Sequence, residues 1–213
     1  MIERYDWSGG NEAILRFGPH EGPVVVAALP LFEEANRTRH FVVTLLRRLA
    51  EQGVAGALPD LPGQGESLLP TEAVRLADLR AAFAGAVQHV DGPAYALGVR
   101  SGALVDATAL LAARWHLTPV TGADLVRELE RQRQAGGGGD YAGNFVAPAL
   151  LSELSRAGIA AQARTVRLDS DVAKADLHVA GTPLWRRAEP GTDAELATRL
   201  AGDVATWVRQ CAV

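Results

Sequence analysis

Short, continuous apolar runs recur along the first half of this chain, and helices are expected between them. The runs cover residues 24–29, 55–58 and 94–99, and each has proline at one or both ends. Apolar runs of this length, without alternation, are typical of strands buried on both faces of a sheet. Residues 39–51 place apolar side chains three and four positions apart, which indicates an amphipathic helix, and a second helix is expected over residues 71–90. Strands that alternate with helices predict a doubly wound α/β fold with a mostly parallel sheet.

The second half of the chain carries a weaker version of the same pattern. Helical spacing predicts helices over residues 122–134 and 193–211, with others over 101–111 and 148–157, and strands are expected at 115–120, 165–168 and 176–180. The short span between the helices at 101–111 and 122–134 leaves little room for a lid. Four consecutive glycines at 136–139 have no side chains to pack, which predicts a mobile loop over 135–147. The alternative, a phosphate-binding loop, would need Lys and Ser or Thr directly after the glycines, and Asp140 and Tyr141 follow instead. We expect one compact domain over residues 1–213.

The composition narrows the classes of partner. The chain has 21 Lys and Arg against 25 Asp and Glu, a net charge of −4, so it lacks the positive surplus that binds a nucleic-acid backbone. The N-terminal MIERYDWSGG is charged, which argues against a secretory signal, and no apolar run approaches the roughly 18 residues of a membrane span. The single Cys211 cannot form an internal disulfide. We therefore expect a cytoplasmic protein with no transmembrane segment, nucleic-acid partner, metal or cofactor, while the oligomeric state stays open.

After the run at 94–99 the chain reads Gly98-Val99-Arg100-Ser101-Gly102. A sharp strand-to-helix turn of the pattern Gly-x-Nuc-x-Gly needs small residues two before and two after the central nucleophile. Gly98 and Gly102 meet this need only if Arg100 is central, since centring the turn on Ser101 would put the stiff, β-branched Val99 at its flank. A guanidinium stays protonated and cannot act as a nucleophile or general base. The pattern predicts a nucleophile elbow that lacks its nucleophile.

The elbow and the segments before it resemble the N-terminal half of an α/β-hydrolase, over residues 13–111. The likeness rests on the strand at 24–29, the loop DLPGQGES at 60–67, the following helix and the elbow. Two strings are also similar to those of the exosortase A system-associated hydrolases of bacteria, PLFEEANRTR at 30–39 and GVRSGAL at 98–104, and segments at 115–122, 141–143 and 184–185 continue the likeness. This resemblance implies an α/β-hydrolase-type sheet and a role in an exosortase- or exopolysaccharide-linked pathway.

The α/β-hydrolase resemblance also implies an oxyanion hole beside the elbow. Its backbone N–H donors would come from Leu31 or Phe32, in the loop after the first strand, and from Ser101. Such a hole can persist where the nucleophile has been replaced.

The rest of a catalytic triad is tested by chain order, which in this fold is nucleophile, acid, histidine. Asp169 and Asp171 follow the strand at 165–168 and can supply the acid, but residues 181–192, where the histidine belongs, contain no histidine. His178 falls inside a predicted strand, where a structural role is the simpler interpretation, and His116 or His40 could reach the cleft from other positions. The triad is degenerate in this interpretation, with Ser101, Asp169 and His178 as the candidates for any unconventional catalysis.

An arginine at the elbow is suited to anions. At a helix N-terminus the free N–H groups and the helix dipole add to the charge of Arg100, which favours a bound carboxylate, phosphate or sulfate, with Asn36 and Arg37 nearby. The alternative is an internal partner: Glu33 or Glu34 could form a buried ion pair with Arg100 and hold the former oxyanion loop against the elbow. The sequence leaves both interpretations open.

The loop at 60–67 has two interpretations as well. Asp60 and Glu66 could coordinate a cation, or the prolines and glycines could simply shape the turn beneath the cleft. No companion His or Cys cluster supports the metal.

Two functions follow from the sequence. In the first, the protein is an α/β-hydrolase-fold protein with a degenerate triad that binds an anionic small molecule or a protein partner. In the second, it is an active hydrolase of an ester or thioester with an unconventional site.

Overall fold

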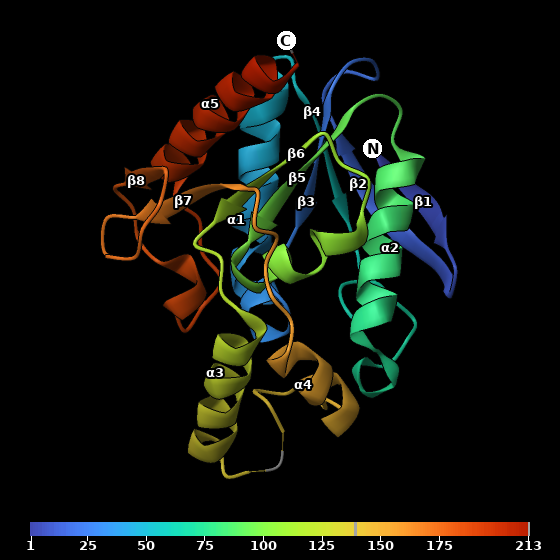
Figure 1. Ribbon diagram of the computed structural model, residues 1–213, viewed down its shortest axis with the longest axis vertical. Helices are drawn as coiled ribbons and strands as arrows, with labels where there is room; N and C mark the ends of the chain where they lie inside the picture. Colours follow the sequence, from blue (N-terminus) through green and yellow to red (C-terminus); the bar gives the residue numbers. More distant parts are fainter. Residues whose placement is uncertain (139, 213) are drawn as a thin grey trace.

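In the computed structural model, which describes residues 1–138 and 140–212, one eight-stranded sheet organises the chain (Figure 1). The strand order is β1-β2-β4-β3-β5-β6-β7-β8, with β1 and β2 antiparallel to their neighbours and β3 to β8 mutually parallel. The strands are β1 (Ile2–Trp7), β2 (Gly10–Phe17), β3 (Val24–Ala28), β4 (Ala55–Pro59), β5 (Ala94–Val99), β6 (Ala113–Leu117), β7 (Arg164–Leu168) and β8 (Leu177–Val179).

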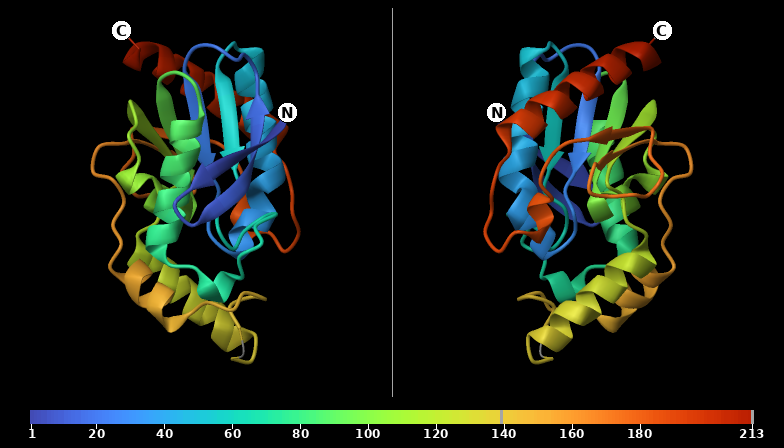
Figure 2. Two further views of the ribbon diagram at one scale, coloured as in Figure 1. Left: turned by 90° about the vertical axis from the view of Figure 1, so that its right-hand side faces the viewer. Right: turned by 90° about the vertical axis from the view of Figure 1, so that its left-hand side faces the viewer.

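Helices cover both faces of the sheet, as a doubly wound fold requires. The α-helices are α1 (Glu33–Glu51), α2 (Leu76–His89), α3 (Gly122–Ala135), α4 (Pro148–Ser155) and α5 (Ala194–Cys211). Figure 2 shows α1 and α2 on opposite sides of the sheet, with α5 beside α1 and the pair α3 and α4 together below the sheet. The predicted α/β class and mostly parallel sheet are confirmed. Within the described residues no helix is long and apolar enough to cross a membrane.

The central strands supply both halves of the hydrophobic core. Every residue of β3 and β5 is buried, and successive side chains of a strand point to opposite faces. In β3, Val24 and Val26 pack on the side of α2, whereas Val25 and Ala27 pack on the side of α1 and α5. This double burial explains why the strand is continuously apolar instead of alternating.

Two segments extend beyond the elements that the sequence predicted. The hairpin of β1 and β2 was not predicted, and it adds two antiparallel strands at one edge of the sheet. The helix expected from residue 39 begins at Glu33, because the first turn carries Glu33 and Glu34, whose charges suit the positive end of a helix. The other boundaries shift by a few residues. The expected mobility of the loop at 135–147 stays a prediction, and Gly139 lies outside the described residues; Tyr141 and Asn144 form a bridge within it.

The α-helix expected over residues 101–111 is wrong. Two short 3-10 helices take its place, η2 (Arg100–Leu104) and η3 (Asp106–Thr108). Two arginine side chains donate hydrogen bonds to backbone carbonyls of this segment. Arg80 Nε donates to the Leu104 carbonyl at 3.1 Å, and Arg114 Nη2 donates to the carbonyls of Asp106 and Ala109, each at 3.1 Å. The backbone hydrogen bonds of this segment span three residues, from the Val105 N–H to the Gly102 carbonyl and from the Ala109 N–H to the Asp106 carbonyl, each at 3.2 Å, so it is 3-10 rather than α-helical.

Candidate functional site at the elbow

The turn between β5 and η2 brings three backbone segments into close contact. Arg100 has a φ of 53°, in the left-handed region that non-glycine residues rarely adopt. A Cβ on Gly102 would lie 2.3 Å from the carbonyl oxygen of Ala28, and one on Gly98 would lie 2.9 Å from the Cα of Ala103. The turn therefore needs glycine at both flanks, with Arg100 at its centre, which is the register that the spacing indicates.

The guanidinium of Arg100 is held by two carboxylates. Its Nε donates to Glu34 Oε2 at 3.1 Å and its Nη2 to Glu34 Oε1 at 3.0 Å, a bidentate pair that is less than a tenth exposed. The same Nη2 also donates to Glu128 Oε2 on α3, at 3.2 Å. Glu33 instead pairs with Arg37, at 3.3 Å. Of the two glutamates that the sequence left open, Glu34 is the partner of Arg100.

Trp185 and a hydrogen bond to its backbone complete the surroundings of Arg100. Its guanidinium carbon lies 5.0 Å from the ring centroid of Trp185, in the 3-10 helix η4 (Leu184–Arg186), which is a cation–π distance. Arg37 Nη1 donates to the Trp185 carbonyl at 3.2 Å and so ties α1 to η4. The side chain of Asn36, which the sequence placed near Arg100, is exposed, and its one hydrogen bond to the described residues is a long one to Glu33, at 3.5 Å.

Burial dominates the electrostatics of Glu34. Removal from water raises the pKa of its carboxyl above the ordinary value, although the hydrogen bonds and charge of Arg100 pull in the other direction. The nearby charge of Glu128 raises the pKa of Glu34 further. Two carboxylates thus share one guanidinium, and the one on α3 is the more exposed of the two, at 34% against 9%.

The expected oxyanion loop lies against the elbow, but one of its donors is engaged. The backbone N–H of Leu31 donates to Ser101 Oγ at 2.9 Å, and both residues are buried. Phe32, at the N-cap of α1, has a φ of 61° and is also buried. The Leu31 N–H would have to leave Ser101 before it could bind a ligand oxygen.

A pocket of about 220 Å³ opens beside Arg100, at the carboxyl ends of β5, β6 and β7. Thr118 and Arg186 line it with Arg100 and Trp185. Thr118 has a φ of 44°, is 4% exposed, and its buried hydroxyl makes no hydrogen bond to the described residues. A strained, β-branched residue with an unpaired polar atom is costly unless the surroundings require it. The edge formed by carboxyl strand ends is where open α/β sheets bind ligands.

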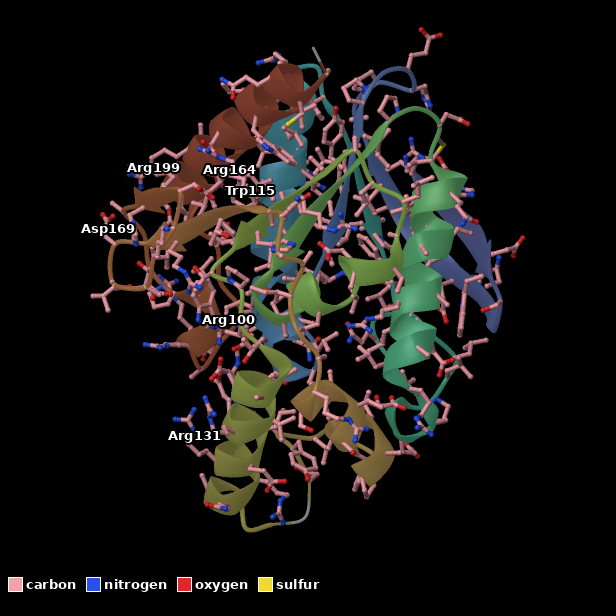
Figure 3. The ribbon with its side chains drawn as sticks, viewed as in Figure 1. Arg100, Trp115, Arg131, Arg164, Asp169 and Arg199 are labelled. Atoms are coloured by element: carbon pink, nitrogen blue, oxygen red, sulfur yellow. The ribbon has the colours of Figure 1, made fainter. Side chains whose placement is uncertain are left out.

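The three candidates for unconventional catalysis do not form a hydrogen-bonded set among the described residues. Ser101 is fully buried against Leu31. His178 is exposed on β8, and its Nε2 lies 3.0 Å from the Asp171 carbonyl oxygen. Asp169 is exposed in the loop after β7, and Figure 3 shows it at the outer edge of the molecule, apart from Arg100.

A buried polar cluster beneath the elbow was missed by the sequence reasoning. His116 Nε2 lies 2.7 Å from Asp106 Oδ2, both side chains are fully buried, and Arg114 Nε lies 3.5 Å from Asp106 Oδ1. The cluster joins η3 to β6, and none of its three residues lines the pocket of about 220 Å³ beside Arg100. His40, the other histidine with a possible cleft role, is exposed on α1. The polar positions of β6 carried the signal, since Arg114 and His116 alternate with the buried Trp115.

The loop at 60–67 is held by its own side chains. Asp60 is 3% exposed, and its carboxylate accepts hydrogen bonds from Arg39 Nη1 at 2.7 Å and from the Glu66 N–H at 3.1 Å. These contacts match the interpretation in which the loop shapes the turn beneath the cleft. No cluster of three or more metal-ligating side chains occurs in the described part of the chain.

The architecture and the glycine-flanked elbow define the class of fold: the chain has the α/β-hydrolase fold, with little or no lid. Solved structures with this fold superpose on nearly the whole chain. The α/β hydrolase domain-containing protein 10 from mouse has a TM-score of 0.64 and 12% identity, with 99% of each chain covered. XC6422 from Xanthomonas campestris, described as a member of a/b serine hydrolase without lid, has a TM-score of 0.60 and 13% identity, covering 99% of this chain and 94% of its own.

A third similar structure is that of Est1E from Butyrivibrio proteoclasticus, with ferulic acid bound. Its TM-score is 0.58 at 15% identity, and the alignment covers 98% of this chain and 99% of Est1E. At these identities the likeness establishes the fold alone. No protein-family model matches the sequence, and no curated protein matches it.

Proposed function

We propose that this protein is a non-hydrolytic member of its fold class, which binds a small anion in the pocket beside Arg100. The observation that carries the proposal is the position of Arg100, since a permanently charged side chain stands where a nucleophile would be, in a turn with the strained backbone of an elbow. The engagement of Ser101 with Leu31 supports binding over hydrolysis. The degenerate triad is part of this proposal.

In this proposal, the carboxylate of Glu128 competes with the anion for Arg100. Its carboxylate meets the guanidinium through one hydrogen bond, and it is about a third exposed, so it can return to water at small cost. An incoming carboxylate or phosphate displaces the carboxylate of Glu128 from Nη2 of Arg100. Arg186 and the unpaired hydroxyl of Thr118 then supply further contacts that Glu128 does not make.

Competition by Glu128 gives the first test. In Glu128→Gln, titration with acetate, malonate and inorganic phosphate by calorimetry should show binding about tenfold tighter than in the wild type, since about 1.4 kcal/mol of competition is removed. The matched control is Glu130→Gln on the same helix, whose carboxylate binds Arg133 and Tyr141 instead. Equal affinities in the wild type and in Glu128→Gln would contradict the proposal.

Thr118→Val tests the pocket itself without disturbing Arg100. Valine keeps the shape and removes the hydroxyl, so anion binding should weaken about fivefold to tenfold while stability stays the same or rises, because an unpaired buried polar atom is lost. Unchanged binding together with raised stability would show that the hydroxyl does not face the ligand.

The alternative function, hydrolysis of an ester or thioester at an unconventional site, has its own measurement. We expect no turnover of p-nitrophenyl acetate, p-nitrophenyl butyrate or an acyl thioester above a buffer control. Turnover that disappears in Ser101→Ala would support the hydrolase and overturn the binding proposal.

On the sequence resemblance, we further propose a biological setting in an exosortase- or exopolysaccharide-linked pathway of a bacterium, with a protein partner as the alternative to a small anion. Deletion of the gene should then alter surface polysaccharide or the sorting of surface proteins. A deletion strain with unchanged polysaccharide and sorting would count against this setting and leave the anion site untouched.

A further inference from the structure

A second hollow lies on the face of the molecule that carries α2. It has a volume of about 610 Å³ and is bounded by α2, by Thr108 of η3, and by α4 with the residues that follow it. It shares no lining residue with the pocket beside Arg100. We call it the α2 groove. Its volume falls within the range of roughly 300–1,000 Å³ that is usual for small-molecule sites.

Beside the α2 groove, the chain after the elbow forms 3-10 helices rather than an α-helix. The 3-10 helices η2 and η3 end at Thr108, and the chain then turns into β6. The flank of α2 on this side carries Ala77 and Ala81, whose small side chains leave the space unfilled, with Leu76 and Ala157 adding apolar surface.

Two arginines give the groove a positive rim. Arg80 is fixed by its Nε bond to the Leu104 carbonyl, at 3.1 Å, which leaves its terminal nitrogens free of protein partners among the described residues. Arg156, directly after α4, is exposed and donates no side-chain hydrogen bond to the described part of the chain. The terminal nitrogens of both guanidinium groups are therefore available to donate hydrogen bonds to a ligand.

The single acidic side chain of the lining, Glu153, is already engaged. It accepts a hydrogen bond from Arg75 Nε at 2.9 Å and another from the Leu76 N–H at 2.9 Å. The hydrogen bonds from Arg75 and Leu76, together with the charges of Arg75 and Arg156, hold the pKa of Glu153 below its ordinary value, so it stays ionised. The groove keeps a surplus of positive charge over a small apolar floor.

We propose that the α2 groove binds an amphipathic organic anion, an acyl or aryl carboxylate. The apolar part lies on Leu76, Ala77 and Ala81, and the carboxylate accepts hydrogen bonds from Arg80 and Arg156. Guanidinium groups bind carboxylates through paired, charge-assisted hydrogen bonds, and the alanines suit a chain or flat ring rather than a sugar. This site is distinct from the one at the elbow and does not depend on it.

Titration with octanoate, followed by calorimetry and by ¹⁵N chemical shifts, tests the charge requirement. Octanoate should bind and shift the amides of α2 and of residues 156–158, whereas octanol should bind at least tenfold more weakly. The double variant Arg80→Gln/Arg156→Gln should lose at least tenfold in octanoate affinity. Arg127→Gln, at an exposed arginine of α3 that pairs with Asp124, is the control and should bind as the wild type does. Equal binding of octanol and octanoate would overturn the proposal.

Filling the groove tests its position. Ala77 is exposed on α2, so Ala77→Leu keeps a strong helix former and should fold normally while blocking octanoate. Ala123→Leu, at an exposed position of α3, is the matched control. Glu128→Gln should leave the octanoate-induced shifts of the α2 amides unchanged, even though it tightens carboxylate binding at the elbow, and this contrast separates the two sites. Octanoate binding that survives Ala77→Leu but is lost in Thr118→Val would assign the ligand to the elbow pocket and overturn the proposal.

Discussion

At the scale of the residue, the pair of Arg100 and Glu34 makes a stability prediction. Arg100→Met leaves a buried carboxylate without its cation, so we expect a loss of about 3–5 kcal/mol in the free energy of unfolding at neutral pH. Denaturant unfolding followed by circular dichroism measures it. Arg48→Met is the control, because Arg48 pairs with Glu51 on the exposed face of α1 and should cost almost nothing.

The pH dependence of the same variant follows from Glu34. Its pKa is raised in the folded protein, so the folded state binds the proton more tightly, and this favourable contribution is lost as the pH rises through the folded pKa. Removing Arg100 raises the folded pKa further, since Arg100 lowers it. The destabilisation by Arg100→Met should therefore shrink as the pH falls from neutral toward the ordinary pKa of a glutamate, and adding Glu34→Gln should abolish that pH dependence. A constant loss across this range would mean that Glu34 keeps another cation.

At the scale of the element, the packing of η2 against β3 depends on Gly102. A Cβ there would meet the carbonyl oxygens of Ala28 at 2.3 Å and Leu29 at 2.7 Å, and backbone cannot move aside cheaply. Gly102→Ala should lower stability by about 3 kcal/mol. Gly202→Ala in α5, where a Cβ meets nothing within 4 Å, should instead raise it by up to about 1 kcal/mol. Thermal unfolding of the two variants checks the contrast, and equal effects would show that η2 can shift away from β3.

At the scale of the whole molecule, the sheet should open from the edge that β8 forms. All residues of β3 and β5 are buried at the centre, whereas β8 has three residues, each at least partly exposed. Amide hydrogen exchange should be slowest in β3 and β5, near the global free energy of unfolding, and fastest among the parallel strands in β8. Protection of β8 equal to that of β5 would mean that another surface covers this edge.

The alternation of strands and helices, the buried central strands and the glycine-flanked elbow could all be predicted from the sequence. These features are local, because the residues that cause a buried strand or a tight turn lie within a few positions of one another in the sequence. Arg100 could be recognised as the central residue of the turn because Gly98 and Gly102 have no other register. The β1–β2 hairpin escaped notice, since its half-exposed strands lack a continuous apolar run.

The partners of the polar residues, in contrast, depend on how the chain folds in three dimensions. Glu34 rather than Glu33 faces Arg100, because the start of α1 turns one of these neighbours inward, and Glu128 arrives from a helix 28 residues further along the chain. The segment after the elbow forms 3-10 helices instead of the predicted α-helix, and Arg80 and Arg114, from α2 and β6, donate to its carbonyls. Such contacts join residues far apart in sequence, and no local pattern encodes them. The sequence therefore predicts the elbow, whereas the ion-pair partners of Arg100 and the groove beside α2 can be seen only in the folded protein.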